Sequence, residues 1–147
     1  MGYNVSKSLD ATGAISAFKI AIANRRYPQR KLIHHSDRGL QYCCDAYQQE
    51  LDDAKVKCSM TESYDPYQNA IAERVNGILK HEFILGITTA DLYLMDKLIQ
   101  QSIYIYNNHR PHWSCWMNTP ALMHKQKKIK IRSYRNKNST ETKPDAI

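Results

Sequence analysis

The chain has 147 residues, of which 42% are hydrophobic and 10% aromatic, which suits one domain with a packed core and argues against wholesale disorder. No apolar run approaches the roughly 18 residues of a membrane-spanning helix, and the first ten residues contain no apolar segment typical of a secretory signal. The net charge is +7, and residues 125–147 carry +6 of it, with eight basic and two acidic side chains.

A helix is the first element that the sequence predicts. Ile15, Phe18 and Ile22 recur at helical spacing within residues 11–26, and Asp10 stands where an N-cap residue is expected. A proline shortly afterwards favours the end of this helix, because the residue before a proline avoids the helical conformation.

Two short strands with a helix between them are predicted next. Residues 31–35 favour the first strand, residues 44–53 a short helix, and residues 55–60, in which apolar side chains alternate, the second strand. Residues 3–5 could add a stub of strand. Because a two-stranded sheet is marginal on its own, we expect further strands to belong to the complete fold.

Two longer helices complete the predicted elements. Residues 61–68 contain Asp-Pro and predict a loop. Residues 69–85 give the most regular helical pattern, and residues 89–107 predict a last long helix. The apolar stripe of the first of these helices consists of Ile71, Val75, Ile78 and Leu79.

Two carboxylates stand out by their positions. Asp37 comes directly after a predicted strand, where a carboxylate is well placed to bind a metal if others converge on it. Glu73 lies off the apolar stripe of its helix. At about 100° per residue, its neighbours on that polar face are Asn69, Asn76 and Lys80. Mg²⁺ prefers oxygen ligands, and a pair of such ions supports phosphodiester chemistry. An ordinary solvated helix face is the alternative interpretation.

The sequence contains three further motifs in a fixed order, followed by Thr119-Pro120: "LIHHSDRGLQY", "SYDPYQNAIAERVNGILKHE" and "YNNHRPH". Together they resemble the integrase core of bacterial insertion-sequence transposases, which are relatives of retroviral integrases. The resemblance covers roughly residues 3–124. It implies an α/β, ribonuclease H-like fold and an Asp-Asp-Glu triad that holds two Mg²⁺ or Mn²⁺ ions. Asp37 corresponds to the second Asp of that triad and Glu73 to the Glu.

The resemblance also implies contacts with DNA. Lys80 matches a lysine that contacts DNA near the active site, and residues 63–68 match the mobile active-site loop. The DNA contacts that we predict are Asn69, Arg74, Asn76 and Lys80 on the helix and Lys127, Lys128 and Lys130 in the basic segment. A basic segment attracts polyanions without reading their sequence, although a flexible, solvated end is equally consistent with it.

The first Asp of the triad has no counterpart in this sequence. Asp10 cannot replace it, because it opens the first helix. We therefore expect an incomplete ribonuclease H-like (integrase catalytic core) fold that lacks the first strands, with residues 1–124 as the C-terminal portion of the core and 125–147 as a basic, flexible tail. Metal binding should be weak or absent and the isolated chain inactive. The bare edge of the first strand should lower solubility.

Two functions remain open at this point. The chain could be a fragment of a DNA transposase or integrase, a family that performs metal-dependent DNA cleavage and strand transfer. It could also be an inactive remnant that binds DNA or a full-length transposase. The expected partners are DNA, comprising element ends and target, and a transposase or second copy, but no membrane. The expected location is the bacterial cytoplasm, at the nucleoid.

The cysteines and histidines allow a weaker alternative. None of the four cysteines forms a C-x-x-C pair, so free thiols in a reducing cytosol are expected. A zinc module would use His34, His35, Cys43 and Cys44, but we expect the two histidines to pack or hydrogen-bond instead. His109 and His112 have a spacing that could bind a metal, whereas the proline between them favours a structural turn.

Overall fold

The computed structural model describes residues 2–62, 66–83 and 91–127. The chain divides into two compact units, residues 1–100 and 101–147, and each unit is described by itself. Within the described ranges, no helix is both long and apolar enough to cross a membrane.

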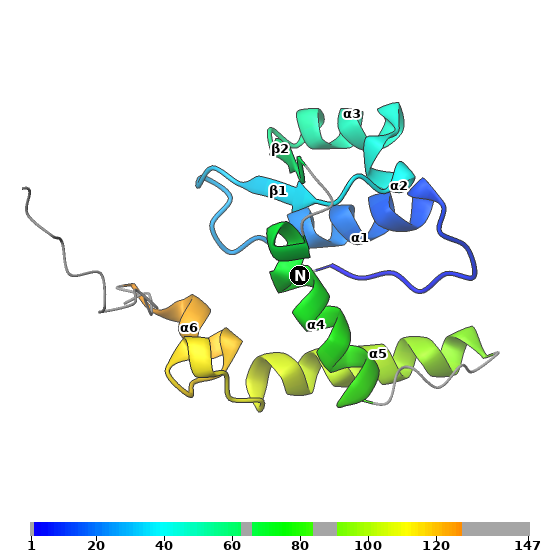
Figure 1. The fold of residues 1–147 in the computed structure, drawn as a ribbon. Coiled ribbons are helices and arrows are strands. Elements are labelled where there is room, and N and C mark those ends of the chain that lie inside the picture. Colours follow the sequence, from blue (N-terminus) through cyan, green and yellow to red (C-terminus); the bar gives the residue numbers. More distant parts are fainter. Residues whose placement is uncertain (1, 63–65, 84–90, 128–147) are drawn as a thin grey trace, which may run out of the picture. The chain divides into compact units, whose positions relative to one another are not determined.

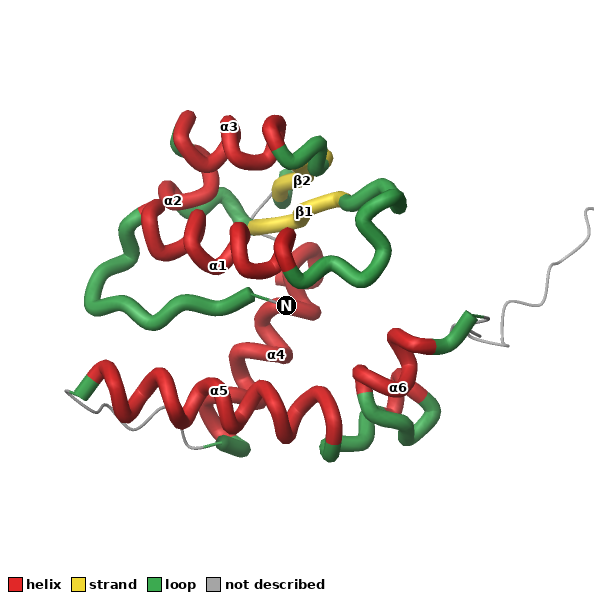
Figure 2. Tube along the Cα trace, turned by 180° about the vertical axis from the view of Figure 1, so that it is seen from behind, coloured by secondary structure: helices red, strands yellow, loops and turns green. Residues whose placement is uncertain are grey.

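The first unit alternates helices with two short strands (Figures 1 and 2). Its elements are α1 (Ala11–Ala23), β1 (Ile33–Ser36), α2 (Leu40–Cys43), α3 (Asp45–Asp53), β2 (Lys57–Met60), the 3-10 helix η1 (Pro66–Asn69), α4 (Ala70–His81) and the first half of α5 (Leu92–Asn108). The strands β1 and β2 pair in parallel, with Ile33 opposite Lys57. Helix α1 packs against α2 and α3, and α3 packs against β2.

The core of the first unit is small and lies between these helices and the strands. Its buried side chains are Phe18, Tyr47, Leu51 and Val56. Ile15 and Ile22 pack against this cluster, so the predicted amphipathic face of the first helix is confirmed. Asp10 occupies the N-cap position but makes no capping hydrogen bond; its carboxylate accepts a hydrogen bond from the Ser8 hydroxyl instead.

A hydrogen-bonded cap ends α3 and aims the chain into β2. Lys55 N–H donates to the Asp52 carbonyl at 2.9 Å, and Val56 N–H donates to the Leu51 carbonyl at 2.9 Å. This is the Schellman pattern, which places one residue in the left-handed conformation. Lys55 occupies that position with φ 53°. The apolar contact that accompanies such caps is supplied by Val56 and Leu51, both of which are in the core.

Several expectations are corrected by the structure. The first helix ends at Ala23 rather than at residue 26, and β1 begins at Ile33 rather than at residue 31. Residues 3–5 form no strand, and the four-residue helix α2 was not predicted. Ile71 belongs to the apolar stripe of α4 but is 84% exposed, and only Ile78 of that stripe is buried.

The second unit contains the remainder of α5, the 3-10 helix η2 (Trp113–Cys115) and α6 (Pro120–Lys125). His112 is buried, and its carbonyl accepts hydrogen bonds from Cys115 N–H and Met117 N–H. His112 therefore organises the turn, as the structural interpretation predicted. Thr119 caps α6 by accepting a hydrogen bond from Leu122 N–H at 3.4 Å, and the proline after it suits the first helical position.

Candidate functional site

Asp37 lies directly after β1 and its side chain is exposed. One carboxylate oxygen accepts a hydrogen bond from Gly39 N–H at 3.0 Å, which closes an Asx turn before α2. The local fold therefore holds the carboxylate at the carboxyl end of the strand. Ligand sites of parallel sheets commonly lie at that end.

Two contacts join the carboxyl ends of the strands. Thr61 N–H donates to the Ser36 carbonyl at 3.1 Å, which extends the pairing by one residue beyond β2. The Arg38 guanidinium then donates through Nε to the Thr61 carbonyl at 2.8 Å. The segment that carries Asp37 is thus fastened to the segment that leaves β2.

His35 connects this sheet end to the start of α4. Its Nε2 lies 3.0 Å from the Gln68 carbonyl, and its Nδ1 lies 2.9 Å from the Ser59 hydroxyl. A carbonyl can only accept, so Nε2 carries a proton and, in the neutral ring, Nδ1 accepts from the hydroxyl. One imidazole thereby links β1, β2 and η1. Sequence reasoning predicted only that this histidine packs or forms a hydrogen bond, and it missed this positioning role.

The loop between β2 and η1 is closed by a second contact of the same glutamine. Glu62 N–H donates to the Gln68 side-chain carbonyl at 2.8 Å. Of the predicted active-site loop 63–68, residues 63–65 lie outside the described residues. The two ends of the loop are therefore fixed by hydrogen bonds that both involve Gln68.

Glu73 lies in the first turn of α4 and is exposed. A carboxylate is favoured at this end of a helix, because the unpaired backbone N–H groups give it a partial positive charge. Arg74, Asn76 and Lys80 on the same helix are also exposed, so the structure leaves them open to a partner. Of the predicted tail contacts, Lys127 is exposed, and Lys128 and Lys130 fall outside the described part of the chain.

The candidate site has carboxylates of the type that bind a hard metal ion, but too few of them among the described residues. Carboxylate oxygens are the ligands that Mg²⁺ and Mn²⁺ prefer. Across the described ranges, however, no three His, Cys, Asp or Glu side chains lie close enough together to hold a metal ion. Asp37 and Glu73 alone do not make up a site for two ions.

The residues of the zinc alternative are engaged elsewhere. His34 lies within an aromatic cluster, 5.5 Å from the Tyr47 ring and 5.9 Å from the Tyr42 ring between centroids, and its Nε2 is hydrogen-bonded to the Tyr47 hydroxyl at 3.1 Å. The thiol of Cys43 faces the Met60 sulfur at 3.8 Å. The expectation that the two histidines pack or form hydrogen bonds is confirmed.

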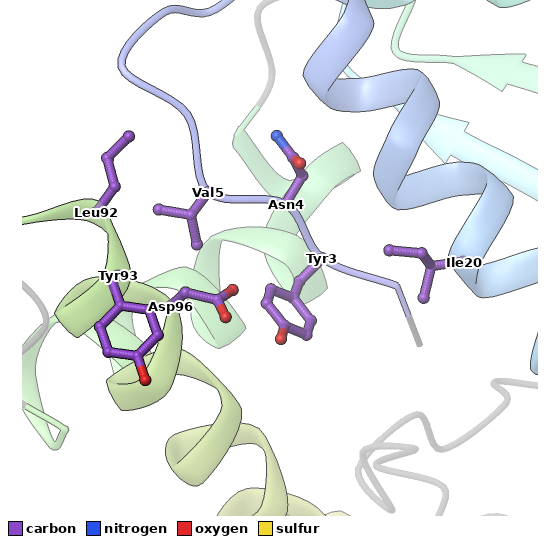
Figure 3. A pocket seen from close by; sticks show the side chains of 7 residues that line it. All are labelled: Tyr3, Asn4, Val5, Ile20, Leu92, Tyr93 and Asp96. Carbon is purple, nitrogen blue, oxygen red and sulfur yellow. The ribbon is translucent and has the colours of Figure 1, made fainter.

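A shallow pocket of about 360 Å³ lies elsewhere in the first unit. Figure 3 shows its lining residues, which are Tyr3, Asn4, Val5, Ile20, Leu92, Tyr93 and Asp96. The Asp96 carboxylate already accepts a hydrogen bond from the Gln100 amide at 2.9 Å. None of the predicted site residues lines this pocket, so it does not belong to the candidate site.

Residues 54–120 match the family model of the integrase core domain. The chain is 38% identical over 84 residues to the transposase for insertion sequence element IS629 of Shigella sonnei, a match that covers 57% of this chain and 28% of that protein. It is 34% identical over 122 residues to the insertion element IS600 uncharacterized 31 kDa protein of Shigella sonnei, covering 82% of this chain and 43% of that protein. The chain thus spans less than half the length of these relatives.

Solved structures give the same fold. The simian T-cell lymphotropic virus intasome in complex with PP2A regulatory subunit B56 gamma matches 87% of this chain and 45% of its own chain, with 21% identity and a TM-score of 0.67. The HTLV-2 integrase catalytic core domain in complex with magnesium matches 81% of this chain and 72% of its own, with 21% identity and a TM-score of 0.58. The chain therefore has the α/β fold of an integrase catalytic core, and it is related to bacterial insertion-sequence transposases, with residues 54–120 matching the integrase core domain.

Proposed function

We propose that this chain is part of a DNA transposase catalytic core and contributes two of its three metal-binding carboxylates, Asp37 and Glu73. The observation that carries the proposal is the relationship of residues 54–120 to the integrase core domain, together with an exposed carboxylate at the carboxyl end of β1. The third carboxylate would come from strands that these residues do not include. Those strands would pair with the edge of β1 opposite β2, where no described residue forms a strand.

The hydrogen bonds around the strand ends support this assignment. Arg38 fastens the turn that carries Asp37, and His35 fastens the entry to α4, on which Glu73 lies. Each carboxylate therefore sits close in sequence to a residue that is anchored on the same pair of strands. Catalytic groups require such support, because small errors in position greatly reduce the rate.

DNA is the partner that we propose for the polar face of α4. Lys80 and Arg74 would contact phosphates, and the amides of Asn69 and Asn76 would add neutral hydrogen bonds. The basic segment 125–147 would increase affinity without adding sequence specificity. A location at the bacterial nucleoid follows from this proposed partner.

Mg²⁺ or Mn²⁺, when bound, would supply the charge stabilisation that phosphodiester cleavage and strand transfer need. The residues of this chain would contribute carboxylate ligands and hold DNA. Because two carboxylates are fewer than a two-ion site requires, we expect the chain alone to bind these ions weakly and to show no turnover.

A second candidate function is that of an inactive remnant that binds DNA or a longer transposase. It is favoured by the finding that, over the residues described, no cluster of three potential metal ligands exists. In that case the carboxylates could be neutralised without loss of any biochemical property, whereas the basic residues would remain essential for binding.

The decisive experiment begins with the DNA upstream of the Met1 codon, translated in all three frames. The longest product that includes this chain is then assayed for metal-dependent strand transfer beside the 147-residue chain. The proposal predicts turnover only by the longer product, and its loss in Asp37→Asn and Glu73→Gln but not in Asp52→Asn, an exposed carboxylate of α3. Turnover by the 147-residue chain, or full activity of both site variants, would overturn it.

A further inference from the structure

Basic residues gather at one place in the first unit. Residues 25–31 contain four Arg or Lys side chains and residues 55–57 contain two, and neither segment contains an acidic residue. Residues 1–124 carry only +1 in total, because 13 basic residues are balanced by 12 acidic ones. Six of these 13 basic residues therefore lie within the ten positions of the two segments. We call Arg25, Arg26, Arg30, Lys31, Lys55 and Lys57 the amino-end cluster.

The two segments lie at the same end of the sheet. The strands are parallel, so the residues that precede β1 and those that precede β2 meet at the amino ends of the strands. Lys57 N–H donates to the Leu32 carbonyl at 3.0 Å, which places Lys31 next to the start of β2. The loops that follow α1 and α3 lie side by side at this end in Figures 1 and 2. Asp37 follows β1 at the opposite end.

The loop between α1 and β1 is held in one shape by its own side chains. Arg30 N–H donates to the Tyr27 carbonyl at 3.2 Å, which closes a turn with proline at its second position, where its fixed φ is favoured. The Arg25 guanidinium donates to the carbonyls of Tyr27 and Arg30. Arg25 therefore acts as a positioning residue for the rest of the cluster.

An aromatic ring orients two of the guanidinium groups. The Arg30 guanidinium lies 4.5 Å from the centre of the Tyr27 ring, and that of Arg26 lies 5.8 Å from it. Such cation–π contacts reduce the conformational freedom that binding would otherwise remove. Both residues are exposed, and a guanidinium presents its N–H donors in a planar arrangement that suits phosphate.

No described carboxylate forms an ion pair with a member of the cluster. Arg26, Arg30, Lys31, Lys55 and Lys57 are exposed. Among the described residues, the ion pair found in this unit joins Lys19 to Glu50 at 2.7 Å and involves no member of the cluster. The acids nearest in sequence are Asp52 and Asp53 at the end of α3, and Asp53 accepts a hydrogen bond from Gln49.

We propose that the amino-end cluster is a contact surface for the phosphate backbone of duplex DNA, separate from the polar face of α4 and from the basic tail. Arg26, Arg30, Lys31 and Lys57 would contact phosphates, and Arg25 would hold the loop. The choice of DNA as the polyanion rests on the proposed function. Backbone contacts of this kind fix the position of a protein on a duplex and carry no sequence information.

The test measures the affinity of the full chain for a duplex of arbitrary sequence between about 50 and 200 mM salt. Arg30→Gln/Lys31→Gln removes two contacts, so the slope of log affinity against log salt should fall by about 1.8, at about 0.9 per phosphate contact. The wild-type chain should therefore lose about twelvefold more affinity than this variant over that range. The charge-retaining Arg30→Lys/Lys31→Arg should keep the wild-type slope.

Two matched variants separate this surface from the others. Lys7→Gln/Lys97→Gln removes the same charge from exposed positions of the first unit outside the cluster and should leave the slope nearly unchanged. Lys127→Gln/Lys128→Gln neutralises part of the tail. Suppose that neutralising the tail weakens DNA binding and Arg30→Gln/Lys31→Gln does not. The proposal that the amino-end cluster contacts DNA would then be refuted, while DNA would remain the proposed partner of the chain.

Three further outcomes would also count against the inference. If neither set of variants changes DNA affinity, the DNA partner of the proposed function fails together with the cluster. If Lys7→Gln/Lys97→Gln lowers the slope equally, only net charge matters. If a polyglutamate peptide of equal charge competes as well as the duplex, the surface recognises acidic polymers in general rather than DNA. Circular dichroism of each variant checks that the fold is retained.

Discussion

The hydrogen bond between Tyr47 and His34 should contribute measurably to the stability of the first unit. Tyr47 is 2% exposed, and its hydroxyl is hydrogen-bonded to His34 Nε2 at 3.1 Å. The other ring nitrogen of His34, Nδ1, is buried and has no hydrogen-bond partner among the described residues. Tyr47→Phe would therefore leave His34 without its partner, while the ring contacts with Phe18 and Tyr42 would be kept.

The expected cost follows from the asymmetry of buried hydrogen bonds. Removing one partner costs about 1–3 kcal/mol, because the remaining polar group is buried without compensation, whereas removing both partners is far less costly. Tyr47→Phe and His34→Phe should each lower the free energy of unfolding by about 1–3 kcal/mol. The double substitution should cost less than the sum of the two, with a coupling of at least about 1 kcal/mol.

The same pair predicts a pH dependence. Burial, with a smaller contribution from the charge of the neighbouring His35, lowers the pKa of His34 from its ordinary value of 6.5. The unfolded chain therefore binds a proton at this residue more readily than the folded chain. Stability from His34 is present above pH 6.5 and is lost as the pH falls from 6.5 through the folded pKa. Burial raises the pKa of Tyr47 to about 12, so its hydroxyl stays protonated throughout.

Urea unfolding followed by circular dichroism at pH 7.5 and 5.5 tests both the coupling of Tyr47 with His34 and the pH dependence of stability. The wild-type chain should lose more stability on acidification than His34→Phe, and the difference measures the contribution of this one residue. Additive costs of the two single substitutions would refute the proposed pairing. An unchanged pH dependence in His34→Phe would refute the assigned protonation.

Three further predictions concern the framework of the first unit. Leu51→Ala should destabilise by about 2–5 kcal/mol, because Leu51 is 1% exposed at the centre of the core; a urea midpoint unchanged from the wild type would contradict this. Lys55→Gly should stabilise by up to about 1 kcal/mol, since glycine suits the left-handed cap position, and a lower melting temperature would count against the cap. His35→Ala should speed amide hydrogen exchange over residues 68–73 but not in α3, and equal acceleration in both would show a global effect.

The sequence was most informative where a repeating pattern decides burial. The spacing of Ile15, Phe18 and Ile22 predicted the face of α1 that contacts the core. Ile71 fits an equally regular stripe on α4 and is nevertheless 84% exposed. A helical stripe shows which side chains could be buried together, whereas burial also requires a packing partner for each turn, and no pattern in one segment reveals that partner.

Local features that leave no repeating pattern or characteristic residue in the sequence were not predicted. Helix α2 has four residues and follows a glycine, so it offers no periodicity. The cap of α3 places a lysine where glycine is usual, and nothing in the sequence marks Lys55 as left-handed. In the candidate site, the strand-end position of Asp37 could be read from the chain. The hydrogen bonds of Arg38 and His35 could not, because their partners are backbone carbonyls of residues distant in sequence.

Mn²⁺ titration of the full chain tests most directly whether Asp37 and Glu73 belong to one metal site, as we propose. Paramagnetic broadening of backbone amide signals reports which residues lie near the ion. If the two carboxylates share one ion, the amides of Gly39 and Arg74 should broaden together. Asp37→Asn should then weaken the broadening at Arg74, whereas Asp52→Asn should not. Broadening at Arg74 that is unaffected by Asp37→Asn would show that the two carboxylates bind metal independently and would contradict the claim.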